Sequence, residues 1–209
     1  MISILLNLDK LLFQLVEQYG NLSYLILFLV VFLESGVVFF SFLPGDGLLF
    51  GAGIIVSESS LNGVFLGLLF LAAAFLGNLL NYYFGKTFGN WLLKRNIIGL
   101  EQLQKGLTFY SKHGDKAILL SRFMPYIRSF VPFIAGITKM NKDSFVRFSF
   151  WGATFWILIF MGVGFLLGHI PEVRDHFTWI VFGMMALSWI PLIFAFFKLV
   201  FQNKSTRSS

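Results

Sequence analysis

The chain has 209 residues, of which 57% are hydrophobic and only 12% are charged, and its mean hydropathy is +0.79. A soluble domain is about 45–50% apolar and about 25% charged, so this composition excludes an ordinary soluble protein and indicates a bilayer as the solvent. Cysteine is absent, which excludes disulfides, zinc–thiolate sites and cysteine nucleophiles. The net charge of +6 is explained by cytoplasmic loops facing anionic lipid, so no nucleic-acid partner is expected.

We expect one membrane domain over residues 1–209, built as an all-α, polytopic helical bundle. Residues 9–20 mix charged and apolar side chains as an amphipathic interfacial helix does. The apolar run 22–43 predicts a membrane helix that leads into a hairpin at 44–56. Pro44 and Gly45 form the turn, and the nine apolar residues that follow, 48–56, are too few to cross a bilayer.

The rest of the chain alternates apolar and basic segments. We expect, in order, a span at 64–85, a cytoplasmic amphipathic region at 86–116, a re-entrant hairpin at 117–138, spans at 148–168 and 177–197, and a cytoplasmic tail at 198–209. Pro125 and Pro132 interrupt the hairpin segment, because proline breaks a continuous helix.

The distribution of Lys and Arg favours the re-entrant interpretation of 117–138. If this segment enters and leaves on one side, every Lys and Arg except Arg122, Arg128 and Arg174 can be cytoplasmic, together with both termini. The hairpin at 44–56 must then enter from the opposite face. Two opposed broken segments are typical of inverted-repeat transporters.

Four charged residues lie inside hydrophobic segments: Glu34, Asp46, Arg122 and Arg128. A charge at the bilayer centre costs roughly 2.5–3.5 kcal/mol on insertion scales, so such residues mark a site. A break at Pro125 would let both guanidinium groups converge on a phosphate, to which arginine binds bidentately. The acids would serve as a proton-coupling pair. The alternative is a set of structural salt bridges with no ligand, and the sequence does not decide which acid pairs with which arginine.

Other polar residues carry weaker signals. Asn78, Tyr82 and Ser121 could line the site, although hydrogen bonding between helices is the simpler interpretation of Asn78. The glycine pairs Gly63/Gly67, Gly85/Gly89 and Gly164/Gly168 have helical spacing, which is common in membrane helices.

Enzyme and metal signatures are mostly absent. The three histidines lack ligand spacing, so no metal or cofactor is expected. Ser121-Arg122 resembles a sequence of membrane lipid phosphatases, but Arg128 stands where those enzymes have histidine. We therefore expect a protein that is not an enzyme.

Long motifs in this chain resemble the DedA family of bacterial inner-membrane proteins. They are FLESG (32–36), FLPGDGLLFGAG (42–53), GNLLNYYFG (77–85) and the stretch 112–136 that contains both arginines. The resemblance implies two opposed re-entrant hairpins and lipid translocation, with Glu34, Asp46, Arg122 and Arg128 as the functional residues. It also exposes two departures, because the family often has Asp at the position of Asn78 and Asn at that of Ser149.

The first hypothesis is a transporter that moves a phosphate-bearing lipid, most plausibly undecaprenyl phosphate, between leaflets. Arg122 and Arg128 would bind the phosphate, while Glu34 and Asp46 would couple its release to protons. The partners are then a membrane lipid and protons, and a homo-oligomer is compatible with the sequence. The alternatives are a proton-coupled cation or drug antiporter, a scramblase of phosphatidylethanolamine or other phospholipids, and a non-transporting membrane organiser.

Overall fold

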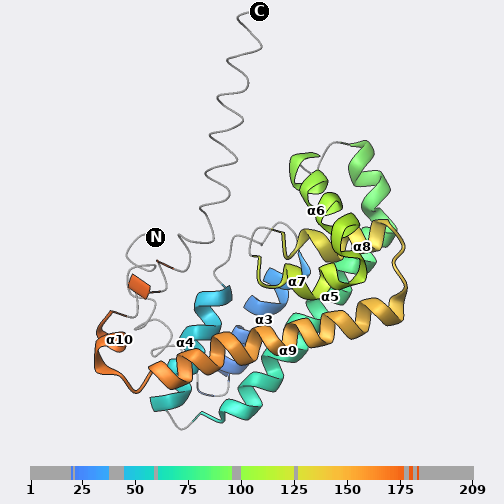
Figure 1. The fold of residues 1–209 in the computed structure, drawn as a ribbon. Helices are drawn as coiled ribbons and strands as arrows, with labels where there is room; N and C mark the ends of the chain where they lie inside the picture. Colours follow the sequence, from blue (N-terminus) through green and yellow to red (C-terminus); the bar gives the residue numbers. More distant parts are fainter. Residues whose placement is uncertain are drawn as a thin grey trace, which may run out of the picture.

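The computed structural model describes residues 20, 22–37, 45–58, 61–95, 100–124, 127–176, 179–180 and 183. Within these ranges the regular structure is helical, and no strand occurs (Figure 1). The expected all-α class is therefore confirmed for the part of the chain that is described.

Two long helices cross the body in opposite directions (Figure 1). They are α5 (Gly63–Lys94) and α9 (Lys142–Leu167), and both are long and apolar enough to span a membrane. Each begins at an asparagine cap: the Asn62 Oδ1 atom accepts from the Phe65 amide, and the Asn141 Oδ1 atom accepts from the amides of Asp143 and Ser144. These caps satisfy amides that the first helical turn leaves unpaired.

Two pairs of shorter helices pack on the long ones. The first pair is α3 (Leu22–Gly36) and α4 (Gly45–Glu58), and the second is α7 (Ala117–Ser121) and α8 (Phe130–Ile137). At about 1.5 Å per residue none of the four reaches across the roughly 30 Å hydrocarbon layer. The predicted break at Pro132 is wrong, because this buried proline lies in the first turn of α8, where its missing N–H removes no helical hydrogen bond.

The short helices are distributed crosswise over the long ones. Helices α3 and α8 pack on α5, whereas α4 and α7 pack on α9. One apolar cluster lies between α3, α4, the first half of α5 and the second half of α9. A second lies where the C-terminal half of α5 meets α7, α8 and the start of α9. The starts of α4 and α8 both lie beside Glu34, because the Gly45 amide and the Ser129 hydroxyl group each donate to it.

The α4 and α9 helices touch backbone to backbone at a pair of glycines. A Cβ atom on Gly53 would meet the Met161 carbonyl oxygen, and one on Gly164 would meet the carbonyl of Phe50. Neither position can accept a side chain without separating the helices, which explains why glycine stands at both.

The α5 and α8 helices repeat this contact. A Cβ atom on Gly136 would meet the Tyr82 carbonyl oxygen, and one on Gly85 would meet the carbonyl of Phe133. The two crossings thus have the same arrangement, a Phe-x-x-Gly segment of a short helix against a glycine of a long one.

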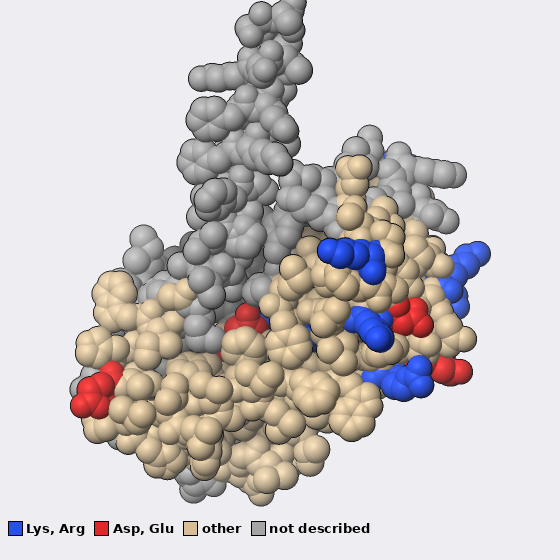
Figure 2. Space-filling view, in the orientation of Figure 1, with Lys and Arg blue, Asp and Glu red and all other residues tan. Residues whose placement is uncertain are grey.

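Exposed basic side chains gather at one end of the molecule (Figure 2). This end contains the C-terminal part of α5, the segment after α6 (Leu100–His113), and the start of α9. The exposed cations there are Lys86, Arg95, Lys112, Lys116, Lys139, Lys142 and Arg147. The opposite end holds the short helix α10 (Pro171–Asp175) (Figure 1).

Some helix limits differ from the sequence predictions. The α3 helix ends at Gly36, before the predicted limit of 43. The α5 helix continues past residue 85 to Lys94, so Lys86 belongs to an unbroken helix and does not begin a loop. The α9 helix starts at Lys142, within the segment expected to be a basic link. Pro44, Pro125, the tail 198–209 and most of 9–20 and 177–197 lie outside the described residues.

Candidate functional site

The four charged residues singled out from the sequence come together inside the protein. Glu34 lies near the end of α3, Asp46 in the first turn of α4, Arg122 directly after α7, and Arg128 directly before α8. Their exposed fractions are 1%, 9%, 4% and 7%. The short helices end or begin at this point. Each charged residue therefore lies at or near the end of a short helix and not in the middle of a membrane span.

Arg128 is paired with both acids. Its Nη2 atom forms an ion pair with the Glu34 carboxylate, and its Nη1 atom donates to the Asp46 Oδ1 atom at 2.7 Å. The Gly45 amide donates to the Glu34 Oε1 atom at 3.2 Å. Arg128 alone offsets only one of the two carboxylate charges, and Arg122, which interacts electrostatically with Asp46, brings the four residues into charge balance.

Arg122 has a different environment. Its Nη2 atom donates to the Ala74 carbonyl oxygen at 2.8 Å, and its Nη1 atom lies 3.4 Å from the Ser35 hydroxyl oxygen. Among the described residues it forms no ion pair with a carboxylate, and its Nε atom has no hydrogen-bond partner. Arg122 is thus a buried cation whose hydrogen-bond acceptors are neutral, and which interacts with the Asp46 carboxylate electrostatically without an ion-pair contact.

The sequence reasoning missed the role of Trp156, which joins the two arginines. Its ring is fully buried in α9 and lies 5.1 Å from the Arg122 guanidinium carbon and 5.3 Å from that of Arg128. Its indole N–H also donates to the Asp46 Oδ1 atom at 2.8 Å. An aromatic ring attracts cations electrostatically, so Trp156 stabilises both guanidinium groups beside one ring.

A signal for Trp156 was present in the helical periodicity of α9. Ser149, Gly152, Ala153 and Trp156 share one helical face and are all buried, whereas Trp151 is exposed. A tryptophan on the small and polar face of a membrane helix differs from the interfacial tryptophans of the aromatic belt.

The starts of α4 and α8 both adjoin the charged cluster. The Gly45 amide at the start of α4 donates to Glu34, and the hydroxyl group of Ser129, the N-cap of α8, donates to the Glu34 carbonyl oxygen at 3.3 Å. Asn81 of α5 donates to the Ser129 carbonyl oxygen at 2.6 Å. Helix N-termini carry partial positive charge and favour anions. The cluster therefore lies in an electropositive frame built by two broken segments.

The predicted lining residues form their described hydrogen bonds outside the four charged residues. Tyr82 donates to the Met140 carbonyl oxygen at 2.7 Å, and Ser121 donates to that of Ile118 at 3.0 Å. Asn78 donates to the Ser149 hydroxyl at 2.9 Å.

The two departures from the DedA pattern, Asn78 and Ser149, are therefore the two partners of one buried hydrogen bond.

The arrangement is suited to binding an anion reversibly. Two guanidinium groups converge on one tryptophan ring, as expected from the break between them, and the carboxylates form direct ion pairs with only one of the two. Among the described residues no group of histidine and acidic side chains could hold a metal ion.

Comparison with known proteins places the chain in a family. The model of the VTT domain matches residues 43–166. Protein DedA of Escherichia coli K12 is 39% identical over 91% of this chain and 90% of its own length. The inner membrane protein YqjA of Escherichia coli K12 is 30% identical over 83% of this chain and 80% of its own length. The inner membrane protein YghB of Salmonella typhimurium is 32% identical over 80% and 78%. No solved structure matches significantly. With the VTT domain matched over most of the described core and these relatives aligned along most of their length, this chain belongs to the DedA family of membrane proteins.

Proposed function

We propose that this protein is a transporter of the bacterial inner membrane that moves a phosphate-bearing lipid, undecaprenyl phosphate, from one leaflet to the other. The observation that carries the proposal is Arg122, a buried guanidinium group with a donor free and no carboxylate partner among the described residues. Burying a guanidinium group that no carboxylate contacts directly is costly, so an anionic ligand would stabilise this arrangement. The relatives named as inner membrane proteins support the location.

The phosphate would bind first at Arg122, where it would replace neutral acceptors. The Ala74 carbonyl and the Ser35 hydroxyl are weaker partners for a guanidinium group than a phosphate, with which arginine forms paired, charge-assisted bonds. The nearby starts of α4 and α8 would add electrostatic stabilisation.

Proton coupling would act through Arg128. Glu34 and Asp46 occupy this arginine in the structure. Protonation of either acid would weaken its ion pair, which would free Arg128 to join Arg122 on the phosphate. Deprotonation would restore the ion pairs and favour release. Both acids would thus control how many arginines a phosphate can contact.

The paired glycine crossings support an inverted-repeat architecture with two re-entrant hairpins. The α4–α9 and α8–α5 contacts use equivalent glycines, as expected if α4–α5 and α8–α9 are two copies of one unit. The basic end of the molecule supports a cytoplasmic position for the segments 86–116 and 139–147, and we place both termini on that side.

A cation or drug antiporter is less well supported by the contacts. Its substrate would have to compete with Arg128 for both Glu34 and Asp46, and Trp156 also bonds to Asp46. It would leave Arg122 without a role. We likewise propose transport without covalent chemistry, because the Ser35 and Ser129 hydroxyl groups at the cluster are hydrogen-bonded to Arg122 and to the Glu34 carbonyl oxygen and none of the described histidines bonds to them.

The test is leaflet exchange of undecaprenyl phosphate in proteoliposomes that contain the wild type, Arg122→Gln or Arg147→Gln. Arg147 is an exposed arginine at the basic end and serves as the matched control. Hydrogen bonds to charged groups contribute about 1.5–3 kcal/mol, so Arg122→Gln should slow exchange roughly tenfold to a hundredfold. Arg147→Gln should leave it unchanged. Exchange at the wild-type rate in Arg122→Gln would refute the phosphate role.

A further inference from the structure

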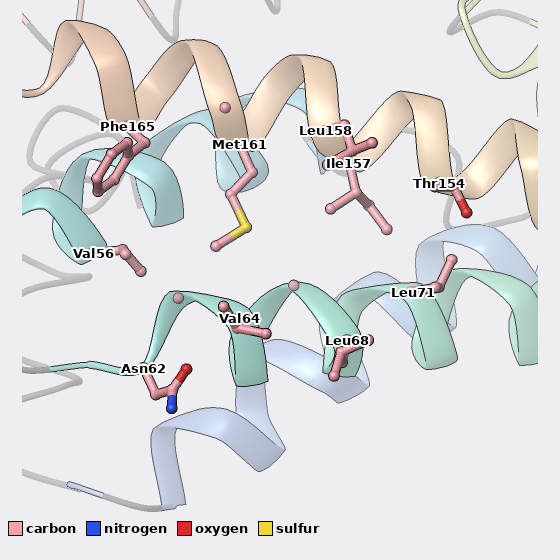
Figure 3. A pocket seen from close by; sticks show the side chains of 13 residues that line it. Val56, Asn62, Val64, Leu68, Leu71, Thr154, Ile157, Leu158, Met161 and Phe165 are labelled. Carbon is pink, nitrogen blue, oxygen red and sulfur yellow. The ribbon is translucent and has the colours of Figure 1, made fainter.

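A groove of about 620 Å³ runs between the first half of α5 and the second half of α9 (Figure 3). Its lining includes six large apolar side chains, those of Val64, Leu68, Leu71, Leu158, Met161 and Phe165. The site described above makes no use of this groove.

The lining suits a hydrocarbon better than a polar ligand. No charged residue lines the groove, and Asn62 and Thr154 supply its polar side chains. The Asn62 Oδ1 atom already caps α5, and the Thr154 hydroxyl donates to the Phe150 carbonyl of its own helix at 2.9 Å. Few side-chain donors or acceptors therefore remain in the groove to bind a polar ligand.

The groove opens towards the membrane and ends beside the charged cluster. Val64, Leu68 and Leu158 are 75%, 59% and 64% exposed, on the two helices able to span a bilayer. Its inner end, at Leu71 of α5, lies less than one helical turn before Ala74, whose carbonyl oxygen accepts a hydrogen bond from Arg122. The groove and the candidate phosphate site are thus neighbours along α5.

We propose that this groove binds the tail of the same lipid whose phosphate is held at Arg122, an inference that rests on the proposed function. From Asn62 to Leu71 the groove measures about 14 Å at 1.5 Å per residue, so it holds the part of the tail nearest the phosphate. The remainder of a long tail stays in the bilayer. The groove fixes where the lipid lies beside the protein, while the arginines hold its phosphate.

Two glycines give the groove its width. A Cβ atom on Gly162 would meet nothing within 4 Å, and one on Gly67 would meet only the Met161 sulfur, at 3.8 Å. Larger side chains at these positions would therefore fill the groove without colliding with backbone. This property distinguishes them from the crossing glycines and makes them suitable for a test.

The first experiment measures binding to Gly67→Phe, Gly162→Phe and the control Ala72→Phe, which adds the same bulk at an exposed α5 position outside the groove. The probes are undecaprenyl phosphate and a single-isoprene phosphate. The groove variants should lose roughly threefold to tenfold in affinity for the long lipid, because a tail displaced into the surrounding lipid loses only packing contacts. Their affinity for the short phosphate should not change, and Ala72→Phe should match the wild type.

Arg122→Gln separates failure of this inference from failure of the proposed function. If both groove variants bind the long lipid normally while Arg122→Gln binds it weakly, the tail site is wrong and the phosphate site stands. If Arg122→Gln also binds the long lipid normally, the proposed function fails and the tail site fails with it.

A second measurement does not depend on filling the groove. The chain has no cysteine, so Leu68→Cys introduces a single thiol in the groove, and Leu76→Cys introduces one on an exposed part of α5 outside it. Undecaprenyl phosphate should slow maleimide labelling of the Leu68→Cys thiol, and the single-isoprene phosphate should not. Equal labelling with and without the long lipid would overturn the proposal. So would cross-linking of that thiol to segment 177–197 or to a second copy, which would identify a different occupant.

Discussion

The α3–α4 half and the α7–α8 half of the molecule contain the same glycine crossing and carry opposite charges. On one side Phe50 and Gly53 of α4 meet α9, and on the other Phe133 and Gly136 of α8 meet α5. Yet α3 and α4 contribute both acids of the cluster, whereas the residues flanking α7 and α8 contribute both arginines.

The comparison shows that the two halves share their backbone packing but differ in the charged residues that they contribute. The repeated crossings bring two helix N-termini together, and the unequal charges turn the meeting point into a site. Because acids and arginines belong to different halves, any movement of one half against the other changes the ion pairs of Arg128. The contacts of Arg122 with Ser35 and Ala74 involve neutral groups and would change at lower cost.

The largest expected effect comes from breaking the crossings. Gly53→Val and Gly136→Val each place atoms where backbone already lies, so both should abolish the folded protein in detergent. Gly162→Val is the control, because its position is open. Size-exclusion chromatography and thermal unfolding provide the measurement. If only one of the two variants fails to fold, the crossings are not equivalent.

Removing Arg128 should have the next largest effect. Arg128→Ala leaves two buried carboxylates without their cation and should cost about 3–5 kcal/mol of stability. Arg122→Ala should cost clearly less, since it leaves no carboxylate unpaired. Adding Glu34→Gln and Asp46→Asn to Arg128→Ala should recover most of the loss in unfolding free energy. Equal losses for the two single arginine variants would contradict the division of roles.

A smaller effect is expected at the shared aromatic surface. Trp156→Phe keeps an aromatic face but removes the indole donor to Asp46, which should cost about 1–2 kcal/mol. Trp151→Phe, at an exposed position of the same helix, is the matched control and should be close to neutral. The two unfolding midpoints test this directly, and equal midpoints would remove Trp156 from the site.

The smallest effect should follow from Ser149→Ala. It removes the acceptor of Asn78 and should cost about 1 kcal/mol. If this polar pair only joins α5 to α9, lipid exchange will proceed at the wild-type rate. Exchange slowed as strongly as in Arg122→Gln would instead show that the pair takes part in transport.

The charged site was predictable from the sequence because burial of charge in an apolar chain is costly wherever it occurs. Glu34, Asp46, Arg122 and Arg128 were identified on that ground alone, and they do meet. The choice of Arg128 as the partner of both acids was not predictable, because it depends on how α4 and α8 cross the long helices.

Backbone contacts and helix limits were also beyond the sequence signals. The four-residue spacings Gly85/Gly89 and Gly164/Gly168 were visible in the sequence. Glycine is common in membrane helices, so these spacings did not identify the helix crossings. The α5 helix was predicted to end near residue 85, because Lys86 and the basic residues after it suggested a loop. Long basic side chains can extend from a helix into the interface, so charge alone does not end it.

Arg122 is expected to receive the lipid phosphate while Arg128 is held by the two acids. The most direct measurement is an experimental structure of the protein in a lipid nanodisc with undecaprenyl phosphate. The phosphate should lie within hydrogen-bonding distance of the Arg122 guanidinium group, with its Nε atom now paired. A phosphate bound only to exposed cations such as Lys142 or Arg147, with the contacts of Arg122 to Ala74 and Ser35 unchanged, would contradict it.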